Sequence, residues 1–150
     1  MGRKTNAAGF SLIELLLVLA IIGIISGIAI PSFLGQRRRA RVIGDAQANA
    51  QVLRMQLETY KADTGAYGAD GTAYVWTGAS GTTVGAPNAA LAALLPGFNP
   101  GGSKMDLTMQ TNNAGLGYKI KVNDPGIAGT PIIYMTDQNG NSLPLTTAFP

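Results

Sequence analysis

The chain of 150 residues contains no cysteine and no histidine. Without cysteine it has no disulfide, no thiolate nucleophile and no cysteine-based zinc or iron–sulfur site. Without histidine it lacks the general base of the common catalytic triads and the commonest ligand of zinc, copper and haem. Charged residues make up only 13% of the chain, against about 25% in typical soluble domains. We therefore expect that the chain is not an enzyme and binds no metal or cofactor. Its length predicts one domain, or one domain with an appendage.

The few charges are divided unevenly along the chain. Residues 1–44 carry a net charge of +5, whereas residues 45–150 carry −2. Most of the N-terminal bases form the arginine cluster, which consists of Arg37, Arg38, Arg39 and Arg41. We interpret it as an anchor to lipid phosphates at a membrane surface, with a contact to acids of a neighbouring molecule as the alternative. Specific nucleic-acid binding is not expected, since the rest of the chain is slightly acidic.

A long uncharged stretch follows Glu14. Residues 15–36 are 22 residues without a charge, and most of them are apolar. A helix needs about 20 such residues to cross a membrane, so residues 12–34 are predicted to form a membrane-spanning helix. A secretory signal peptide is the alternative, because Gly27-Ile28-Ala29 offers a small-x-small cleavage pattern. The length of the apolar run and the early carboxylate of Glu14 favour the span.

The helical pattern continues beyond the predicted span. Apolar side chains recur three or four residues apart, which is the spacing of one face of a helix. They are Val42, Ala46, Ala50, Leu53, Leu57 and Tyr60. The pattern stops at Asp63-Thr64-Gly65, where Gly65 suits the left-handed residue that commonly ends a helix. One long helix is therefore predicted, apolar all round and then amphipathic, with a kink or local weakening at Pro31.

Residues 66–150 are predicted to form a small antiparallel sheet. Alternation of apolar and polar residues marks strands at 105–110 and 118–123, and further strands are expected at 73–77, 131–136 and 142–146. Asn88 is expected to cap a short helix that ends before Pro96. Turns are expected at 112–115, at 124–126 and at Asn139-Gly140, which is a type I′ hairpin signal.

Such a sheet has one apolar face that needs a cover, and the amphipathic helix is the expected cover. Val42, Leu53, Leu57 and Tyr60 are the residues expected to pack on the sheet. The predicted fold class is therefore α+β, a long N-terminal helix packed against a small antiparallel sheet.

The residues at the head of the predicted span carry a family resemblance. Gly9-Phe10-Ser11-Leu12-Ile13-Glu14, followed by the apolar run, resembles the N-terminal segment of type IV pilins and type II secretion pseudopilins. That family has a glycine ending a short leader, usually Phe next, Thr or Ser after it, and Glu five residues past the glycine. Pro31 matches a proline common in this helix, and Leu57–Gly65 resembles its end. The resemblance covers roughly residues 1–67, and beyond them only the plan of a sheet on a helix agrees.

The resemblance implies processing and a location. A prepilin peptidase would cut between Gly9 and Phe10 and methylate the new amine of Phe10. Residues 1–9 would be the leader, 10–34 the transmembrane and assembly helix, 35–65 the amphipathic helix, and 66–150 the globular sheet region. The precursor would cross the bacterial inner membrane once with its leader in the cytoplasm, and the assembled filament would be extracellular or periplasmic. A literal count of positive charges beside the span points weakly to the opposite orientation.

The resemblance also implies assembly residues and partners. Glu14 would pair with the N-terminal amine of a neighbouring subunit, and an unpaired ionisable group is costly to bury in a span, which independently favours this role. Snorkelling of that carboxylate toward the headgroups is the alternative. Gly23 and Gly27 permit close helix approach, and Pro31 belongs to the same assembly helix. The implied partners are identical or related pilin subunits in a helical filament, the prepilin peptidase, the inner-membrane assembly machinery and membrane lipids.

Three classes of function are weighed on these grounds. A structural subunit of a type IV pilus-like filament is preferred, and a pseudopilin of a type II secretion system acting in protein export is the alternative. A monomeric membrane-anchored binding domain is the remote alternative. Asp137–Asn141 superficially suggests a calcium loop, and major secretion pseudopilins carry a C-terminal calcium site. A hairpin turn is preferred here, because Ala148 stands where an EF-hand has its glutamate.

Overall fold

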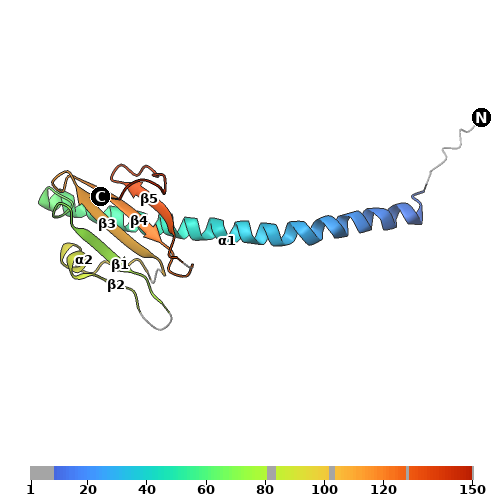
Figure 1. The fold of residues 1–150 in the computed structure, drawn as a ribbon, viewed down its shortest axis with the longest axis horizontal. Coiled ribbons are helices and arrows are strands. Elements are labelled where there is room, and N and C mark those ends of the chain that lie inside the picture. The colour runs from blue at the N-terminus through green and yellow to red at the C-terminus, as the bar shows by residue number, and fades with distance from the viewer. Residues whose placement is uncertain (1–8, 81–83, 102–103, 128, 150) are drawn as a thin grey trace, which may run out of the picture. The chain divides into compact units, whose positions relative to one another are not determined.

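The structure is a computed structural model that describes residues 9–80, 84–101, 104–127 and 129–149, apart from the side chains at positions 31 and 32. The chain divides into two compact units, residues up to Arg41 and residues Val42–Pro150. The first unit is helical after residue 11, and the second combines the rest of that helix with a sheet (Figure 1). The expected α+β architecture, a long N-terminal helix with a small antiparallel sheet, is confirmed.

Helix α1 comprises Leu12–Thr64 and runs from the first unit into the second. The helix continues through position 31, so Pro31 does not end it. Gly65 has a φ of +88°, and its N–H donates to the Lys61 carbonyl over 2.7 Å. This left-handed residue closes the helix where the sequence predicts its end, because glycine adopts positive φ without the steric cost of a Cβ.

The sheet is antiparallel throughout, with the strand order β2-β1-β3-β4-β5. Its strands are β1 (Ala73–Thr77), β2 (Ala86–Pro87), β3 (Asp106–Asn112), β4 (Gly117–Asn123) and β5 (Ile132–Asp137). Four of these lie where the sequence predicts strands, whereas β2 was not predicted, because two residues are too few for a pattern. Helix α2 (Ala89–Leu94) follows β2, and the Asn88 side chain accepts from the Leu91 N–H over 2.8 Å, as an N-cap residue does.

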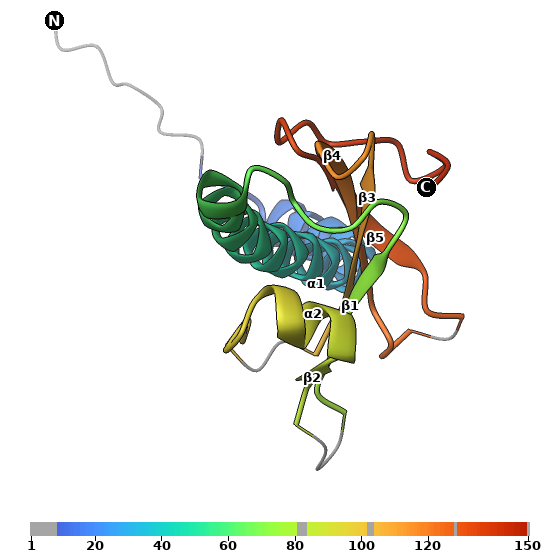
Figure 2. The same ribbon diagram turned by 90° about the vertical axis from the view of Figure 1, so that its left-hand side faces the viewer.

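The amphipathic part of α1 covers one face of the sheet, as expected. Leu53 and Leu57 are at most 1% exposed, and Val42 and Tyr60 are half-buried against the same core. Figure 2 shows this part of α1 beside the sheet, with α2 below it. Most other large members of the core come from strands β1, β3, β4 and β5 and from α2, and Tyr67 and Phe98 join them from loops. Those on the strands and α2 include Trp76, Leu91, Leu107, Met109, Tyr118, Ile120, Val122 and Tyr134.

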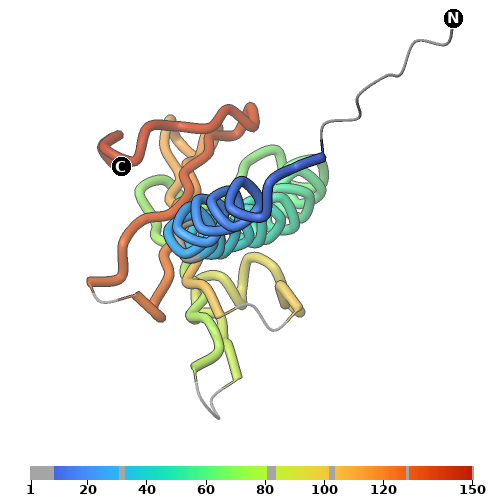
Figure 3. The backbone as a smooth tube through the Cα atoms, turned by 90° about the vertical axis from the view of Figure 1, so that its right-hand side faces the viewer, coloured from blue at the N-terminus to red at the C-terminus, as the bar shows by residue number. Residues whose placement is uncertain are grey.

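The predicted strand at 142–146 is wrong. Only Ser142 forms a bridge, to Thr136 of β5, and the chain then turns so that the Thr147 N–H donates to the Pro144 carbonyl over 2.9 Å. Pro144 has no N–H to give to a ladder, which favours the turn over a strand. The segment after β5 turns back beside that strand (Figure 3).

The turn at Asn139-Gly140 is present, but its predicted type is wrong. Type I′ requires positive φ at both central residues, and only Gly140 has it, at +84°. The carboxylate of Asp137 instead accepts hydrogen bonds from the N–H groups of Asn139, over 3.0 Å, and Asn141, over 2.9 Å. This side chain organises the turn, as Asp does in Asx turns.

Candidate functional site

The predicted cleavage bond lies directly before helix α1. Gly9 and Phe10 are exposed and outside the helix, which begins at Leu12, and the Phe10 side chain is 85% exposed. Most of the predicted leader, residues 1–8, lies outside the described residues. A protease needs an accessible backbone outside regular secondary structure at its cleavage bond, and the residues at the Gly9–Phe10 bond meet this condition.

Glu14 lies in the first turn of α1, where its carboxylate faces the start of its own helix. Its Oε2 accepts a hydrogen bond from the Ser11 N–H over 3.2 Å, while the N–H groups of Glu14 and Leu15 donate to the Ser11 carbonyl. Ser11 and Glu14 thus form half of a capping box. The positive end of the helix dipole adds to this, because it favours an anion in the first turn. The second oxygen, Oε1, has no hydrogen-bond partner among the described residues.

The link between Ser11 and Glu14 was missed in the sequence, although its signal is present. A Ser followed three residues later by Glu, just before an apolar run, is the capping-box pattern. One carboxylate oxygen is therefore engaged at the helix start, and the other is available.

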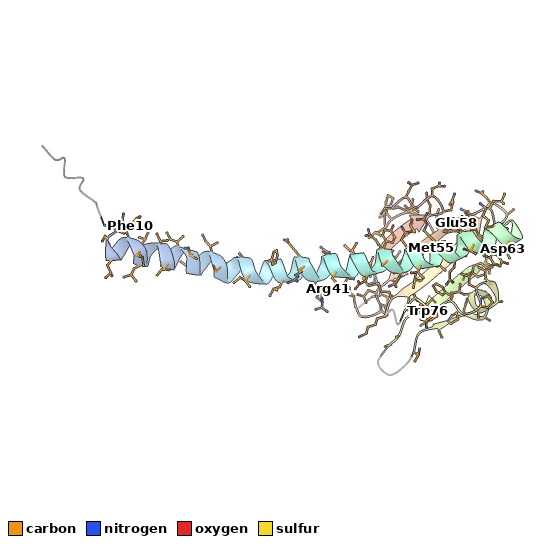
Figure 4. The ribbon with its side chains drawn as sticks, turned by 180° about the vertical axis from the view of Figure 1, so that it is seen from behind. Phe10, Arg41, Met55, Glu58, Asp63 and Trp76 are labelled. Carbon is orange, nitrogen blue, oxygen red and sulfur yellow. The ribbon has the colours of Figure 1, made fainter. Side chains whose placement is uncertain are left out.

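The apolar half of α1 presents its side chains outward on all sides (Figure 4). Its large side chains are exposed, for example Leu15 at 57% and Ile28 at 74%. Among the residues that the structure describes, α1 is the one helix that is long and apolar enough to cross a membrane. A Cβ added at Gly23 or Gly27 would meet no atom within 4 Å, so both glycines leave open space at the helix surface.

Exposed apolar surface on this scale needs lipid or other protein around it, because soluble monomers rarely expose large contiguous apolar patches. The arginine cluster follows directly, and all four of its side chains are exposed.

The amphipathic part of α1 also carries a carboxylate, Glu58, that contacts side chains of the sheet region. Glu58 accepts hydrogen bonds from the hydroxyl of Tyr67 over 2.9 Å and from that of Tyr118 over 3.4 Å. Lys61 Nζ also donates to the Tyr67 hydroxyl, over 3.3 Å. Burial raises the pKa of Tyr118, and Glu58 adds to this, while Arg54 opposes it. Burial likewise raises the pKa of Tyr67.

These contacts are structural in character. The rings of Tyr67 and Tyr118 pack edge to face with their centroids 4.5 Å apart, as aromatic core residues do. Arg54 donates to the Gln138 carbonyl over 3.4 Å and so joins the helix to the turn after β5. Helix periodicity assigns these residues to a face, but it cannot reveal which distant segments reach back to them.

The turn Asp137–Asn141 uses its carboxylate internally. Burial by itself would raise the pKa of Asp137, but hydrogen bonds from the Asn141 side chain and from the N–H groups of Asn141, Asn139 and Gly140 outweigh it and lower the pKa. The described residues contain no group of three His, Cys, Asp or Glu side chains placed to hold a metal ion.

A long N-terminal helix with an apolar first half, an early glutamate and a small antiparallel sheet packed on its second half is a type IV pilin-like architecture. Residues 4–30 match the family model described as the prokaryotic N-terminal methylation motif. The chain is also 40% identical, over 78 residues, to the type IV wide pilus major component PilA4 of Thermus thermophilus. That alignment covers 51% of this chain and 58% of the relative, so the chain spans little more than half of that protein's length. No solved structure matches the chain.

The two matches confirm the resemblance to the type IV pilin family that Gly9–Glu14 and the apolar run indicate. This is a family of structural subunits and not of enzymes. The roles of Gly9, Phe10, Glu14, Gly23 and Pro31, and of the arginine cluster, stay predictions.

Proposed function

We propose that the chain is a structural subunit of a type IV pilus-like filament, assembled from the inner membrane after removal of residues 1–9. The observation that carries this proposal is the exposed apolar half of α1 with Glu14 at its head, directly after an accessible Gly9–Phe10 bond. A surface of this kind is stable in lipid as a monomer and in a bundle of like helices as a filament.

Cleavage supplies a positive charge that can pair with the Glu14 carboxylate. The new amine of Phe10 carries a positive charge four residues before the carboxylate. Within one copy, Glu14 already accepts from the Ser11 N–H through Oε2. Its Oε1 is left to accept from the Phe10 amine of a neighbouring copy, so one carboxylate serves both its own helix start and the contact between subunits.

The environment strengthens this pairing as assembly proceeds. Two opposite charges about 4 Å apart attract by about 1 kcal/mol in water and about 4 kcal/mol at an effective dielectric constant near 20. Packing of the apolar half of α1 against other copies excludes water from the pair. Lateral association therefore pairs two opposite charges that would each be costly to bury alone, which favours filament growth over a dispersed monomer.

The arginine cluster follows the apolar segment and is proposed to lie at the membrane surface before assembly, where lipid phosphates attract it. The globular unit would then lie outside the cytoplasm. We propose a prepilin peptidase, inner-membrane assembly machinery and further copies of this chain, or of related pilins, as its partners.

A pilus is favoured over a type II secretion pseudopilus within the same family. The relative in Thermus thermophilus is named as the major component of a wide pilus, and it shares 40% identity over the aligned residues.

Cell-surface material sheared from expressing bacteria tests the proposal. Electron microscopy should show filaments that disappear when the gene is deleted. The intact mass of the filament subunit should correspond to residues 10–150 with one added methyl group. A mature N-terminus at Ile30 would contradict the processing step and favour a signal peptide. A processed protein that stays in the membrane fraction as a monomer would contradict the filament.

A further inference from the structure

The arginine cluster surrounds helix α1 at the C-terminal end of its apolar half. Successive residues of an α-helix point about 100° apart, so Arg37, Arg38 and Arg39 point to three different sides. All four guanidinium groups are exposed, and none has a hydrogen-bond or ion-pair partner among the residues that the structure describes. A carboxylate that approaches from almost any side can therefore meet one of them.

Asp45 is the first acid after the cluster, four residues beyond Arg41. Its side chain is exposed and lines an open groove with Ala48 of α1 and with Lys104 and Asp124 of the sheet region. Within the described ranges its carboxylate has no hydrogen-bond or ion-pair partner, so not even Lys104 neutralises it. It is accessible to a cation from another molecule.

A base followed by an acid four residues later recurs once more in α1, at Arg54 and Glu58. That pair is already engaged inside its own subunit. Glu58 accepts hydrogen bonds from two tyrosine hydroxyls, and Arg54 donates to Gln51 and Gln138. Arg41 and Asp45 are the pair at this spacing that remains available to a neighbour.

The proposed pairing of Glu14 with a neighbour's Phe10 amine sets a stagger between two copies. Positions 10 and 14 are four residues apart, which corresponds to about 6 Å along a helix. Identical parallel copies keep the same axial shift along their whole length. The shift that brings the neighbour's Phe10 level with Glu14 therefore also brings the neighbour's Arg41 level with Asp45.

We propose that Asp45 of one copy binds the arginine cluster, and Arg41 above all, of the neighbouring copy. The contact requires the proposed filament of parallel copies and so rests on the proposed function. It gives the filament a second charge pair at the same stagger, outside the apolar zone. Without the leader, the side chains of residues 10–44 carry a net charge of +3 and those of residues 45–150 carry −2, so the two regions are complementary in the same sense.

Two charge reversals, made in separate copies, test the contact. Asp45→Arg places like charges across the proposed interface, and Arg41→Asp does so in the opposite sense. Because like charges across an interface disfavour association strongly, each variant expressed alone should yield about tenfold less filament than the wild type. Expressed together, the two variants should recover filaments to within about twofold of the wild-type yield, since every mixed contact again pairs Arg with Asp.

The mixed expression separates a contact between copies from an ion pair within one helix. In each variant the Arg41–Asp45 pair of a single chain is broken, and a second variant chain does not repair it. Rescue by co-expression therefore requires contact between copies. Asp63→Arg is the matched control, because Asp63 is an exposed acid of the same helix with Thr59, and no base, four residues before it. It should assemble like the wild type.

Introduced cysteines give a second measurement, because the chain has none of its own. Filaments that contain both Arg41→Cys and Asp45→Cys subunits should form a disulfide-linked heterodimer on mild oxidation, whereas filaments of either variant alone should form far less dimer. Wild-type yield from Asp45→Arg, or no rescue on co-expression, would overturn the contact and leave lipid as the partner of the cluster. Absence of filaments from the wild-type chain would instead refute the proposed function.

Discussion

Leu53→Ala measures how strongly helix α1 is held on the sheet. The Leu53 side chain is 1% exposed and belongs to the core that α1 shares with the sheet. Residues Val42–Pro150 form a compact unit with this core, so the soluble fragment of those residues is the suitable protein for the experiment. The fragment also avoids the apolar half of α1, which would aggregate in water.

The expected cost follows from the atoms removed. Truncation to alanine removes three buried carbon atoms, worth about 0.8 kcal/mol each, or about 2.4 kcal/mol in transfer free energy. The cavity left behind adds to this, because a packed core relaxes only partly, and measured Leu→Ala changes in cores span about 2–5 kcal/mol. We expect the free energy of unfolding to fall by about 3 kcal/mol.

Urea unfolding followed by circular dichroism measures this loss. With a typical slope of about 1–3 kcal/mol per molar urea, the midpoint should fall by about 1–3 M while the slope stays unchanged. Met55→Ala is the matched control, because Met55 lies two residues on in the same helix but is 72% exposed, and its cost should stay below about 0.5 kcal/mol. A loss below about 0.5 kcal/mol for Leu53→Ala would refute the packing and place this side chain against another molecule.

Three further predictions concern single polar groups. Glu14→Gln should insert and be cleaved normally, because a neutral amide is cheaper to bury, but it should assemble poorly when expressed alone; wild-type filament yield from a fully processed variant would disprove the pairing mechanism. Asn88→Ala should destabilise the fragment by about 1–2 kcal/mol, because Asn88 caps α2 and also bonds β1, and an unchanged urea midpoint would contradict this. The pKa of Asp137 is lowered from its ordinary 3.8, so the folded state binds this proton less readily, and the stability of the wild type relative to Asp137→Asn should decline as pH falls through 3.8 and below. A difference in unfolding free energy between the wild type and Asp137→Asn that stays constant between pH 6 and pH 2 would contradict the lowered pKa.

The assembly segment could be predicted from sequence because its signals are local. An uncharged apolar run reports membrane compatibility regardless of tertiary contacts, and Gly9–Glu14 forms a contiguous motif. The capping link from Ser11 to Glu14 was equally within reach, since both residues lie in the first turn of one helix. What no local pattern reveals is which atom of Glu14 stays available for a neighbour.

The globular unit was predictable wherever side-chain periodicity reports burial. The spacing of Leu53 and Leu57 identified the buried face of α1, and alternation located β3 and β4, because a helix or strand with one covered face repeats its apolar residues at a fixed period. Periodicity failed at Leu143 and Leu145, where apolar residues alternate but Pro144 and a turn prevent a strand.

The sequence by itself determined the apolar segment, the processing motif, the buried stripe of α1 and most of the strands. Only the tertiary structure decided that β1 pairs with β3, that Glu58 accepts hydrogen bonds from Tyr67 and Tyr118, and that Arg54 donates to the turn after β5. The features that the sequence determined depend on the hydropathy of neighbouring residues or on its helix or strand period, and both can be taken directly from the sequence. The contacts that only the tertiary structure decided join residues far apart in the chain, because the packing of the whole globular unit determines which of these residues meet.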